Sequence, residues 1–344
     1  MIAELLGRLL LPKPLAGVDA RRTFDALLAS DAGDAGRAAI LVALAARAET
    51  AGELAALAAE MRRRARPFPV PPSDRPIDLC GSGGAPRRSF NVSTVSAFVV
   101  AADGVPVVKH GNRSARSPSG SSDLLEALGL PVVDAPGFAR ATYRRHRLAF
   151  LHAPLFHPAT RAVAPARRLI GIPTPFNRLG PLTNPAPVAY QVAGAPDLAS
   201  AERTAAVLKL RGVRRGISMT SAEGCDEFSP RAPTRIVTWD GGSTRRGTVR
   251  PERLLAPEDR RGSWGALPAP SAAEEAERIL AGGGGARRGS VVLTSGAALW
   301  VAGRTPTLAA GVERAGELLD DGRAEKLLAD LRLLAPRYAT HREG

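Results

Sequence analysis

The stretch IDLCGSGGAPRRSFNVSTVSAFVVAA, residues 77–102, decides the fold. Residues 77–80 form a short apolar run typical of a buried strand, and residues 93–102 form a longer apolar run typical of a helix. Between them lies Gly81-Ser82-Gly83-Gly84. Glycine clusters also occur in plain tight turns. Here, however, a strand precedes the glycines and a Ser-Thr helix start follows, so we expect a phosphate site with unpaired N–H groups.

Outward from this stretch, short apolar runs alternate with helical patterns, and helices dominate again from about residue 272. Further strands are expected at residues 105–108, 148–151, 188–192, 217–220 and 236–239, and a further helix at 121–128. This alternation predicts an α/β domain with a mainly parallel central sheet flanked by helices.

The residues before this domain have a different pattern. Up to about residue 66, apolar residues recur at helical spacing, and Thr50 with Glu53 forms the signature of a capping box. Prolines 67, 69, 71 and 72 then allow no helix to continue. We therefore predict an all-helical N-terminal domain over residues 1–72 and an α/β domain over residues 73–344.

The net charge of +14 comes from 47 Lys and Arg residues against 33 Asp and Glu. Lysine occurs only at positions 13, 109, 209 and 326, and the arginines are spread along the whole chain. Such a bias is more typical of a GC-rich genome than of a binding face. A nucleic-acid partner is therefore not expected, although the charge leaves that alternative open.

The two cysteines, Cys80 and Cys225, can form no disulfide framework and lack the partners of a zinc site. A reducing, cytoplasmic location is the expectation. The apolar run of residues 1–15 is interrupted by Glu4, Arg8 and Lys13. It is too short to span a bilayer, so we expect an amphipathic helix and no membrane partner.

A second polar segment, Lys109 to Ser114, follows the strand expected at residues 105–108. Ligands of open α/β sheets gather at strand ends. Because the chain uses arginine for nearly every cation, Lys109 suggests a compact point charge at a phosphate; a solvated lysine is the alternative. The hydroxyls of Gly120-Ser121-Ser122-Asp123 precede the next helix and could cap it or hold a phosphate.

A third segment, residues 224–230, places Asp226 beside Glu227 in a loop after a strand. Adjacent acids are usually solvated charges. Magnesium on a diphosphate, however, takes one or two carboxylates together with substrate oxygens and water, which fits this pair. The chain has no H-E-x-x-H motif and no serine nucleophile elbow that would indicate other chemistry.

In this order and spacing, the segments closely resemble the anthranilate phosphoribosyltransferase family over residues 77–230. The shared motifs are Phe-Asn-x-Ser-Thr, Lys-His-Gly-Asn-Arg, Gly-Ser-Ser-Asp-Leu-Leu-Glu-Ala-Leu-Gly, His-Pro-Ala at 157–159 and Gly-Pro-Leu-Thr-Asn-Pro at 180–185. The resemblance implies a small helical domain, to which a segment near 155–185 returns, beside a larger α/β domain, usually in a homodimer. It also implies a Mg²⁺-dependent enzyme of tryptophan biosynthesis that joins phosphoribosyl pyrophosphate to anthranilate.

The resemblance assigns roles by family position. The whole loop from Lys109 to Ser117 would hold phosphoribosyl pyrophosphate. The individual residues that would contact it are Gly81, Gly83, Gly84, Ser89, Asn91, Ser93, Thr94, Lys109, Gly111, Asn112, Arg113, Ser117 and Ser121. Those that would contact anthranilate are Gly81, His110, Asn112 and Arg167, and those that would hold Mg²⁺ are Ser93, Asp226 and Glu227. Arg167 would pair with the acceptor's carboxylate. His157 is interpreted as structural.

The chain departs from the family pattern at a few positions. Ala85 stands where the family has an acid, and His152, Pro173 and Arg178 stand where it more often has an aromatic, an arginine and an aliphatic residue. The missing acid at Ala85 would affect metal binding near the pyrophosphate. The other three changes flank the acceptor side, so another aromatic acceptor is one alternative. A non-catalytic nucleic-acid-binding relative is another, which the intact Asp226-Glu227 pair and Lys109 speak against.

Overall fold

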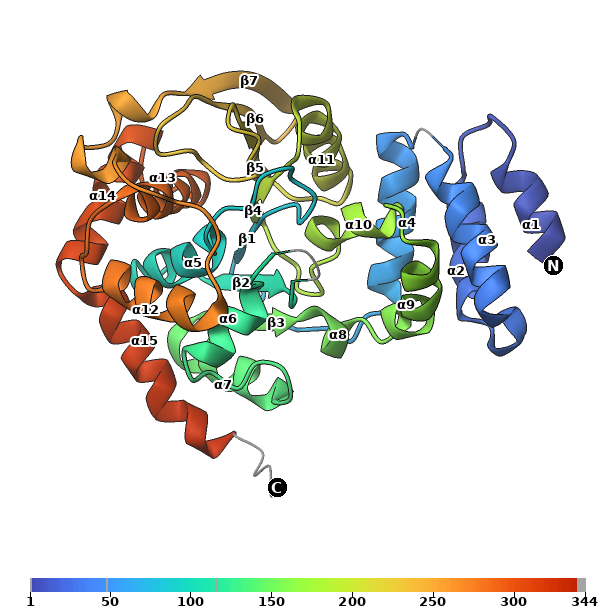
Figure 1. Ribbon diagram of the computed structural model, residues 1–344, viewed down its shortest axis with the longest axis horizontal. Coiled ribbons are helices and arrows are strands. Elements are labelled where there is room, and N and C mark those ends of the chain that lie inside the picture. Colours follow the sequence, from blue (N-terminus) through green and yellow to red (C-terminus); the bar gives the residue numbers. More distant parts are fainter. Residues whose placement is uncertain (1, 48, 115–116, 339–344) are drawn as a thin grey trace.

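The computed structural model describes residues 2–47, 49–114 and 117–338 of the chain. In this part of the chain, seven strands form one sheet with helices on both faces, and a bundle of helices lies at one end of the molecule (Figure 1). The predicted fold class is confirmed. None of the helices in these ranges is long and apolar enough to cross a membrane.

The sheet has the strand order β3-β2-β1-β4-β5-β6-β7. Its strands are β1 (Ile77–Cys80), β2 (Val107–Gly111), β3 (Leu148–His152), β4 (Tyr190–Gly194), β5 (Arg215–Ser221), β6 (Thr234–Asp240) and β7 (Ser243–Val249). The first five in this order are parallel, and β6 and β7 are antiparallel. The chain moves outward from β1 in one direction and from β4 in the other, so a crevice is expected at the carboxyl ends of these strands.

Helices cover both faces of the sheet and form the bundle. They are α1 (Ile2–Leu9), α2 (Gly17–Leu28), α3 (Gly33–Ala45), α4 (Ala51–Arg63), α5 (Val92–Ala102), α6 (Ser121–Ala127), α7 (Pro136–His146), α8 (Ala153–Phe156), α9 (Ala159–Ile170), α10 (Phe176–Leu179), α11 (Leu198–Leu210), α12 (Ala269–Leu280), α13 (Ala286–Val301), α14 (Leu308–Asp320) and α15 (Arg323–Leu334). Ile77 and Leu79 of β1 face one hydrophobic core together with α5 and α13, whereas Cys80 faces a second core shared with α11 and the bundle. This split follows from the alternation of side chains along a strand.

The bundle contains helices from two separate parts of the chain. Helix α9 packs against α2 and α3, and the rings of Phe24 and Phe176 lie 5.6 Å apart between α2 and α10. The capping box of α4 is confirmed, because Glu53 N donates to Thr50 Oγ1 at 3.1 Å and Thr50 N donates to Glu53 Oε2 at 2.7 Å. The domain limit at residue 72 stays a prediction.

Two features differ from the sequence expectation. Strand β7 was not predicted, because its residues up to Thr248 are exposed and polar and show no apolar alternation. Lys109 and His110 were expected after a strand but lie within β2, where they pair with Phe150 and Leu151 of β3. The β2–β3 ladder continues past the apolar run because both polar side chains find partners in the interior.

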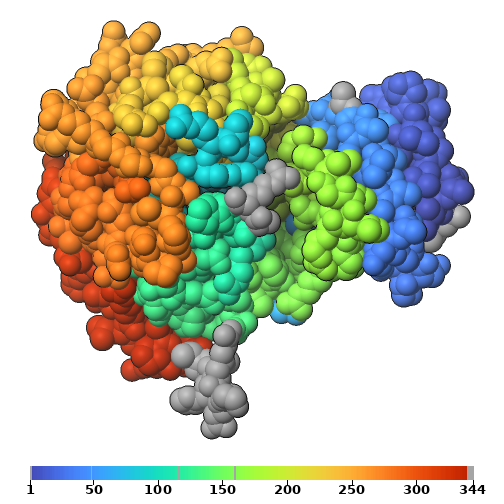
Figure 2. All heavy atoms as spheres, in the orientation of Figure 1, coloured from blue at the N-terminus to red at the C-terminus, as the bar shows by residue number. Residues whose placement is uncertain are grey.

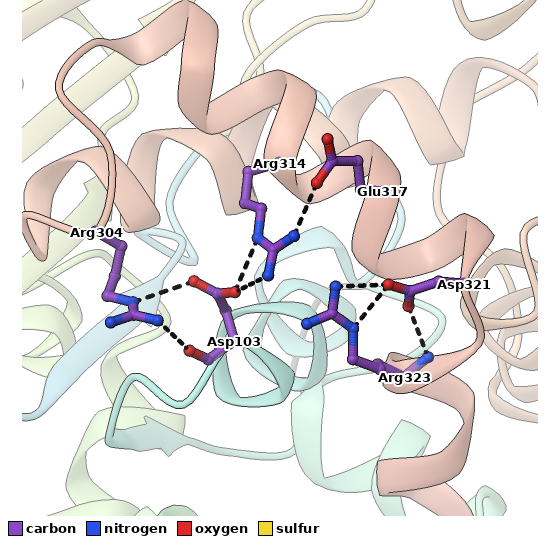
Figure 3. A network of polar contacts seen from close by, with 6 residues as sticks. All are labelled: Asp103, Arg304, Arg314, Glu317, Asp321 and Arg323. Carbon is purple, nitrogen blue, oxygen red and sulfur yellow. Dashed lines mark hydrogen bonds and ion pairs between the residues drawn. The ribbon is translucent and has the colours of Figure 1, made fainter.

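An ion-pair network fixes the far end of α5 (Figure 3). Asp103, just after this helix, accepts hydrogen bonds from Arg304 Nε at 3.1 Å and from Arg314 Nη2 at 2.7 Å. Arg304 also donates to the Asp103 carbonyl at 3.0 Å. The network therefore ties α5, whose other end faces the candidate site, to α13 and α14.

Candidate active site

A hollow of about 400 Å³ lies where the carboxyl ends of β1, β2 and β5 meet α9 and α10. Predicted site residues that line it are Gly81, Gly83, Ser89, Asn91, Ser93, Thr94, Lys109, His110, Gly111, Asn112, Arg113, Ser117, Ser121, Arg167, Asp226 and Glu227. Gly84 is the exception: it is exposed beside the hollow, and its N–H donates to Ser82 Oγ. Positions 115 and 116 of the predicted loop lie outside the described residues. In Figure 2 the cyan loop after β1 lies on the face shown, near the green segment that holds α9 and α10.

The glycine-rich loop holds a carboxylate in this structure. Asp226 Oδ2 accepts hydrogen bonds from Ser82 N at 2.6 Å, Ser82 Oγ at 2.7 Å and Gly83 N at 3.2 Å. Gly81 makes the approach possible, because a Cβ at this position would lie 3.0 Å from Asp226 Oδ2. The loop thus has the anion-binding geometry expected from its sequence, and the anion is a side chain of the same protein.

Glu227 lies deeper in the same corner. Burial and, after it, the neighbouring Asp226 raise the pKa of Glu227 to about 8, although Lys109 and Ser93 act in the opposite direction. Its Oε2 is buried and has no hydrogen-bond partner among the described residues. Lys109 Nζ donates to Leu79 O at 2.6 Å and to Ser93 Oγ at 3.2 Å, so its positive charge lies beneath the hollow.

These oxygens fit a magnesium ion that is shared with a substrate. No group of three or more His, Cys, Asp and Glu side chains within the described ranges could hold a metal alone. Asp226, Glu227 and Ser93 nevertheless bring hard oxygen ligands together, and the orphaned Glu227 Oε2 lacks a partner that a cation would provide. Two carboxylates completed by diphosphate oxygens and water are typical of Mg²⁺ sites.

A late segment of the chain, which sequence reasoning missed, positions the start of α5. Phe90 N donates to Trp264 O at 3.0 Å, and Ser89 forms an isolated bridge with Gly265. Ser119 Oγ donates to Asn91 Oδ1 at 2.8 Å and also to Leu267 O at 2.9 Å. Residues 264–267 carry no charged or glycine-rich motif, and no sequence signal linked them to the site.

The loop after β2 is held against the first turn of α6. Gly120 has no room for a side chain, because a Cβ would collide with the backbone of Asn112 and Arg113. Ser121 Oγ donates to Asn112 O at 3.1 Å. Arg113 forms ion pairs with Asp123 at 2.7 Å and Glu126 at 2.5 Å, so its charge is paired within the protein.

The opposite wall contains Arg167 of α9. Burial lowers the pKa of its guanidinium, and no acidic side chain among the described residues offsets that burial. A half-buried, unneutralised guanidinium facing a hollow is a ready partner for a carboxylate. Phe176, Asn177, Gly180 and Pro181 line the same wall; the sequence motif at 180–185 pointed to this segment without assigning it a role.

Two buried histidines lie next to that wall, and one of them, His110, lines the hollow. His110 Nδ1 lies 3.3 Å from Gly180 O, and its ring centroid is 5.0 Å from that of His157. Burial lowers the pKa of His110 to about 3 and that of His157 to about 4, so both rings are neutral at neutral pH. His157 lines no part of the hollow.

Comparisons with known proteins cover nearly the whole chain. Residues 3–65 match the helical bundle domain of a glycosyl transferase family, and residues 73–325 match its a/b domain. Anthranilate phosphoribosyltransferase from Syntrophobacter fumaroxidans is 41% identical over 96% of this chain and 98% of its own. The enzyme of the same name from Methylobacterium radiotolerans is 39% identical over 100% of this chain and 98% of its own.

Solved structures lead to the same family. The crystal structure of anthranilate phosphoribosyltransferase from Thermus thermophilus has a TM-score of 0.87 and 35% identity, and covers 96% of this chain and 99% of its own. The yeast enzyme in complex with PRPP and Mg, at 22% identity and a TM-score of 0.82, shares the fold over 98% of both chains. The matches in sequence, in both domains and in fold agree, and this chain therefore belongs to the anthranilate phosphoribosyltransferase family.

Proposed function

We propose that this protein transfers the 5-phosphoribosyl group of phosphoribosyl pyrophosphate to the amine of anthranilate, with N-(5-phosphoribosyl)anthranilate and pyrophosphate as products. The observation that carries the proposal is the convergence of three strand-end loops, after β1, β2 and β5, on one hollow that faces Arg167. Close relatives along the full chain bear the name of this activity.

The diphosphate end of the donor is assigned to the loop after β1 and the start of α5. Backbone N–H groups at Ser82 and Gly83 already bind a carboxylate, which a phosphate oxygen can replace. Lys109 adds a buried positive charge beneath Ser93. These groups would stabilise the charge that grows on the departing pyrophosphate while the ribose carbon becomes cationic.

Magnesium is assigned to Asp226, Glu227 and Ser93. When bound, it supplies further charge neutralisation for the leaving group. Two solved structures of the yeast anthranilate phosphoribosyltransferase, a variant with Mg bound and a complex with PRPP and Mg, support this choice of ion. Asn112, Arg113 and Ser121 line the same hollow and are assigned to the ribose-phosphate end of the donor.

The acceptor is assigned to the wall formed by α9 and residues 176–181. The aromatic amine of anthranilate is unprotonated at neutral pH, so no strong base is needed, and the neutral ring of His110 can remain beside it. Arg167 would hold the carboxylate and aim the amine at the ribose carbon. Gly81 and Asn112 would contact the acceptor from the donor side.

Arg167→Ala tests the acceptor assignment. We expect the variant to lose roughly 10- to 100-fold in affinity for anthranilate, because it removes a charge-assisted pair, and to keep its affinity for phosphoribosyl pyrophosphate. Calorimetric titration with each substrate in the presence of Mg²⁺ measures both. Arg168→Ala is the matched control, since Arg168 is exposed on the same helix and does not line the hollow.

An equal loss of both affinities in Arg167→Ala would contradict this role of Arg167. Titration of the wild-type protein with a panel of aromatic amines would identify the acceptor. If another amine binds more tightly than anthranilate, that amine would be the acceptor in place of anthranilate.

We further propose a homodimer and a cytoplasmic location within tryptophan biosynthesis. Exposed apolar side chains gather in the helical bundle, at Leu10, Leu11, Val18 and Val42, where a second copy could cover them. Cys80 and Cys225 are buried and free, as in proteins of reducing compartments. The same hollow accounts for the retained Lys109 and acid pair without a nucleic-acid partner.

A further inference from the structure

We propose that His152 is a positioning residue for the phosphoribosyl end of the donor, acting through Ser122. His152 is the last residue of β3, and Ser122 is the second residue of α6. His152 Nδ1 and Ser122 Oγ lie 2.8 Å apart and share a hydrogen bond, with both side chains almost fully buried. This inference rests on the proposed function, because it concerns the geometry of that donor site.

The bond fastens the first turn of α6 to the sheet. The same turn carries the loop after β2, since Ser122 N donates to Asn112 O at 3.3 Å and Ser121 Oγ donates to it at 3.1 Å. Gly111 packs tightly against Ser121, because a Cβ at position 111 would collide with Ser121 Oγ. A displacement of Ser122 therefore moves Gly111, Asn112 and Ser121 together, and all three line the hollow.

His152 is the group in position to hold this turn. It lies directly beside Gly111 in the β2–β3 register, so its imidazole reaches Ser122 from the neighbouring strand. The cavity around the pair is only about 10 Å³, which is close to the smallest volume that holds one water. Solvent cannot easily replace the imidazole, and a Ser122 hydroxyl without it would be a buried group with no partner.

The test is a double-mutant cycle with His152→Phe and Ser122→Ala. Phenylalanine fills the site but offers no hydrogen-bond partner, so we expect His152→Phe to raise the KM for phosphoribosyl pyrophosphate about tenfold, with kcat changed less than about twofold. Adding Ser122→Ala removes the orphaned hydroxyl, and the double variant should return to within about threefold of wild type, since paired apolar replacements cost little. Calorimetric titration with the donor and Mg²⁺ should rank the affinities of these variants in the same order as their KM values.

Further variants separate positioning from general destabilisation. His152→Asn keeps a polar atom near the position of Nδ1 and should recover most of the donor affinity. Ser96→Ala is the matched control, because Ser96 is a buried serine that bonds Val291 O away from the hollow, and it should leave the KM unchanged. Measuring the melting temperature of each variant would check that it is folded at the assay temperature.

The inference is overturned if His152→Phe binds the donor as wild type does, if kcat falls while the KM holds, or if the double variant is as weak as His152→Phe. Failure of the proposed function looks different, because then the wild-type protein itself would not bind phosphoribosyl pyrophosphate with Mg²⁺.

Discussion

At the scale of single residues, Asp226 has two competing roles. Its Oδ2 accepts hydrogen bonds from Ser82 N and Gly83 N, although those donors are assigned to the diphosphate and Asp226 is assigned to the metal. A diphosphate without a cation must therefore displace a carboxylate and approach its negative charge. The two roles become compatible only when a cation draws the carboxylate and the diphosphate together.

We predict that Asp226→Asn binds metal-free pyrophosphate about tenfold more tightly than wild type, because a competing charge is removed from the loop. With Mg²⁺ present the order should reverse. Isothermal titration with inorganic pyrophosphate, in EDTA and in Mg²⁺, measures both. Glu223→Gln is the control, because Glu223 is an acid of the same loop whose carboxylate bonds Ser229 and Arg231 and not the glycine loop. Equal gains in pyrophosphate affinity in both variants would contradict a specific competition by Asp226.

The buried histidines predict how stability depends on pH. Both pKa values lie below the ordinary 6.5, at about 3 for His110 and about 4 for His157. Above pH 6.5 the folded and unfolded states are neutral at these sites. Below it the unfolded chain binds protons that the folded chain does not, so each histidine should reduce the free energy of unfolding by about 1.4 kcal/mol per pH unit, down to its folded pKa.

Urea denaturation at pH 7, 6 and 5 measures this slope. His157→Asn should make this slope shallower, because one of the two groups no longer titrates. Above pH 7 the variant and the wild type should have the same slope. A slope unchanged by His157→Asn would mean that other groups govern the acid sensitivity.

Residue identity predicted which side chains line the hollow where unusual residues stand in a pattern, and their roles stay predictions. Lys109, Asp226 and the glycine loop were found because a rare lysine, an acid pair and a glycine cluster stand at or just after the carboxyl ends of apolar runs. The present partners of these residues could not be predicted. Arg113 pairs with Asp123 and Glu126, and Asp226 with the glycine loop, because such contacts depend on distances between separate elements.

At the scale of elements, the sequence revealed those with an apolar pattern and hid those without one. Strands β1 to β6 were located from apolar runs, whereas β7 faces water along most of its length and has no such run. Residues 264–267 were missed for a related reason. Their function is carried by backbone groups that bond Phe90 and Ser119, and a backbone bond leaves little trace in residue type.

The Asp103 network makes α5 a test of element stability (Figure 3). We predict that Asp103→Ala lowers the free energy of unfolding by about 2 kcal/mol, because a buried carboxylate with several charge-assisted bonds is lost. Arg304 loses its ion pair, whereas Arg314 retains its pair with Glu317. Chemical denaturation measures the loss. Asp321→Ala removes an acid that pairs with nearby Arg323 and should cost much less. Equal losses would show that the network does not stabilise the helix.

At the scale of the whole molecule, the apolar surface of the bundle predicts assembly. We expect sedimentation to give a dimer for the wild-type protein and Leu10→Glu to shift it toward monomer, because a charge would be buried at the contact. Leu333→Glu, on the exposed side of α15, is the control and should leave the mass unchanged. A wild-type monomer at micromolar concentration would end the homodimer proposal.

The overall arrangement could be predicted from the order of patterns along the chain, but not the distances that make the site work. Helical repeats, a proline-rich break and alternating strands and helices were enough for the fold class. That the loops after β1, β2 and β5 share one hollow follows from sheet order, and sheet order is a matter of long-range pairing that no local pattern records.

The two-part helical bundle has a consequence for how the chain is made. Helix α4 ends at Arg63, and α9, which packs on α2 and α3, begins only at Ala159. At ribosomal speeds of about 5–20 residues per second, roughly 5 to 20 s pass between the synthesis of α4 and that of α9, which completes the bundle. During that interval Phe176 is not available to pack against Phe24, and the apolar surface of the bundle is exposed to chaperones and to the emerging strands. Slowing of translation between these helices should therefore lower the yield of folded protein more than slowing after α10.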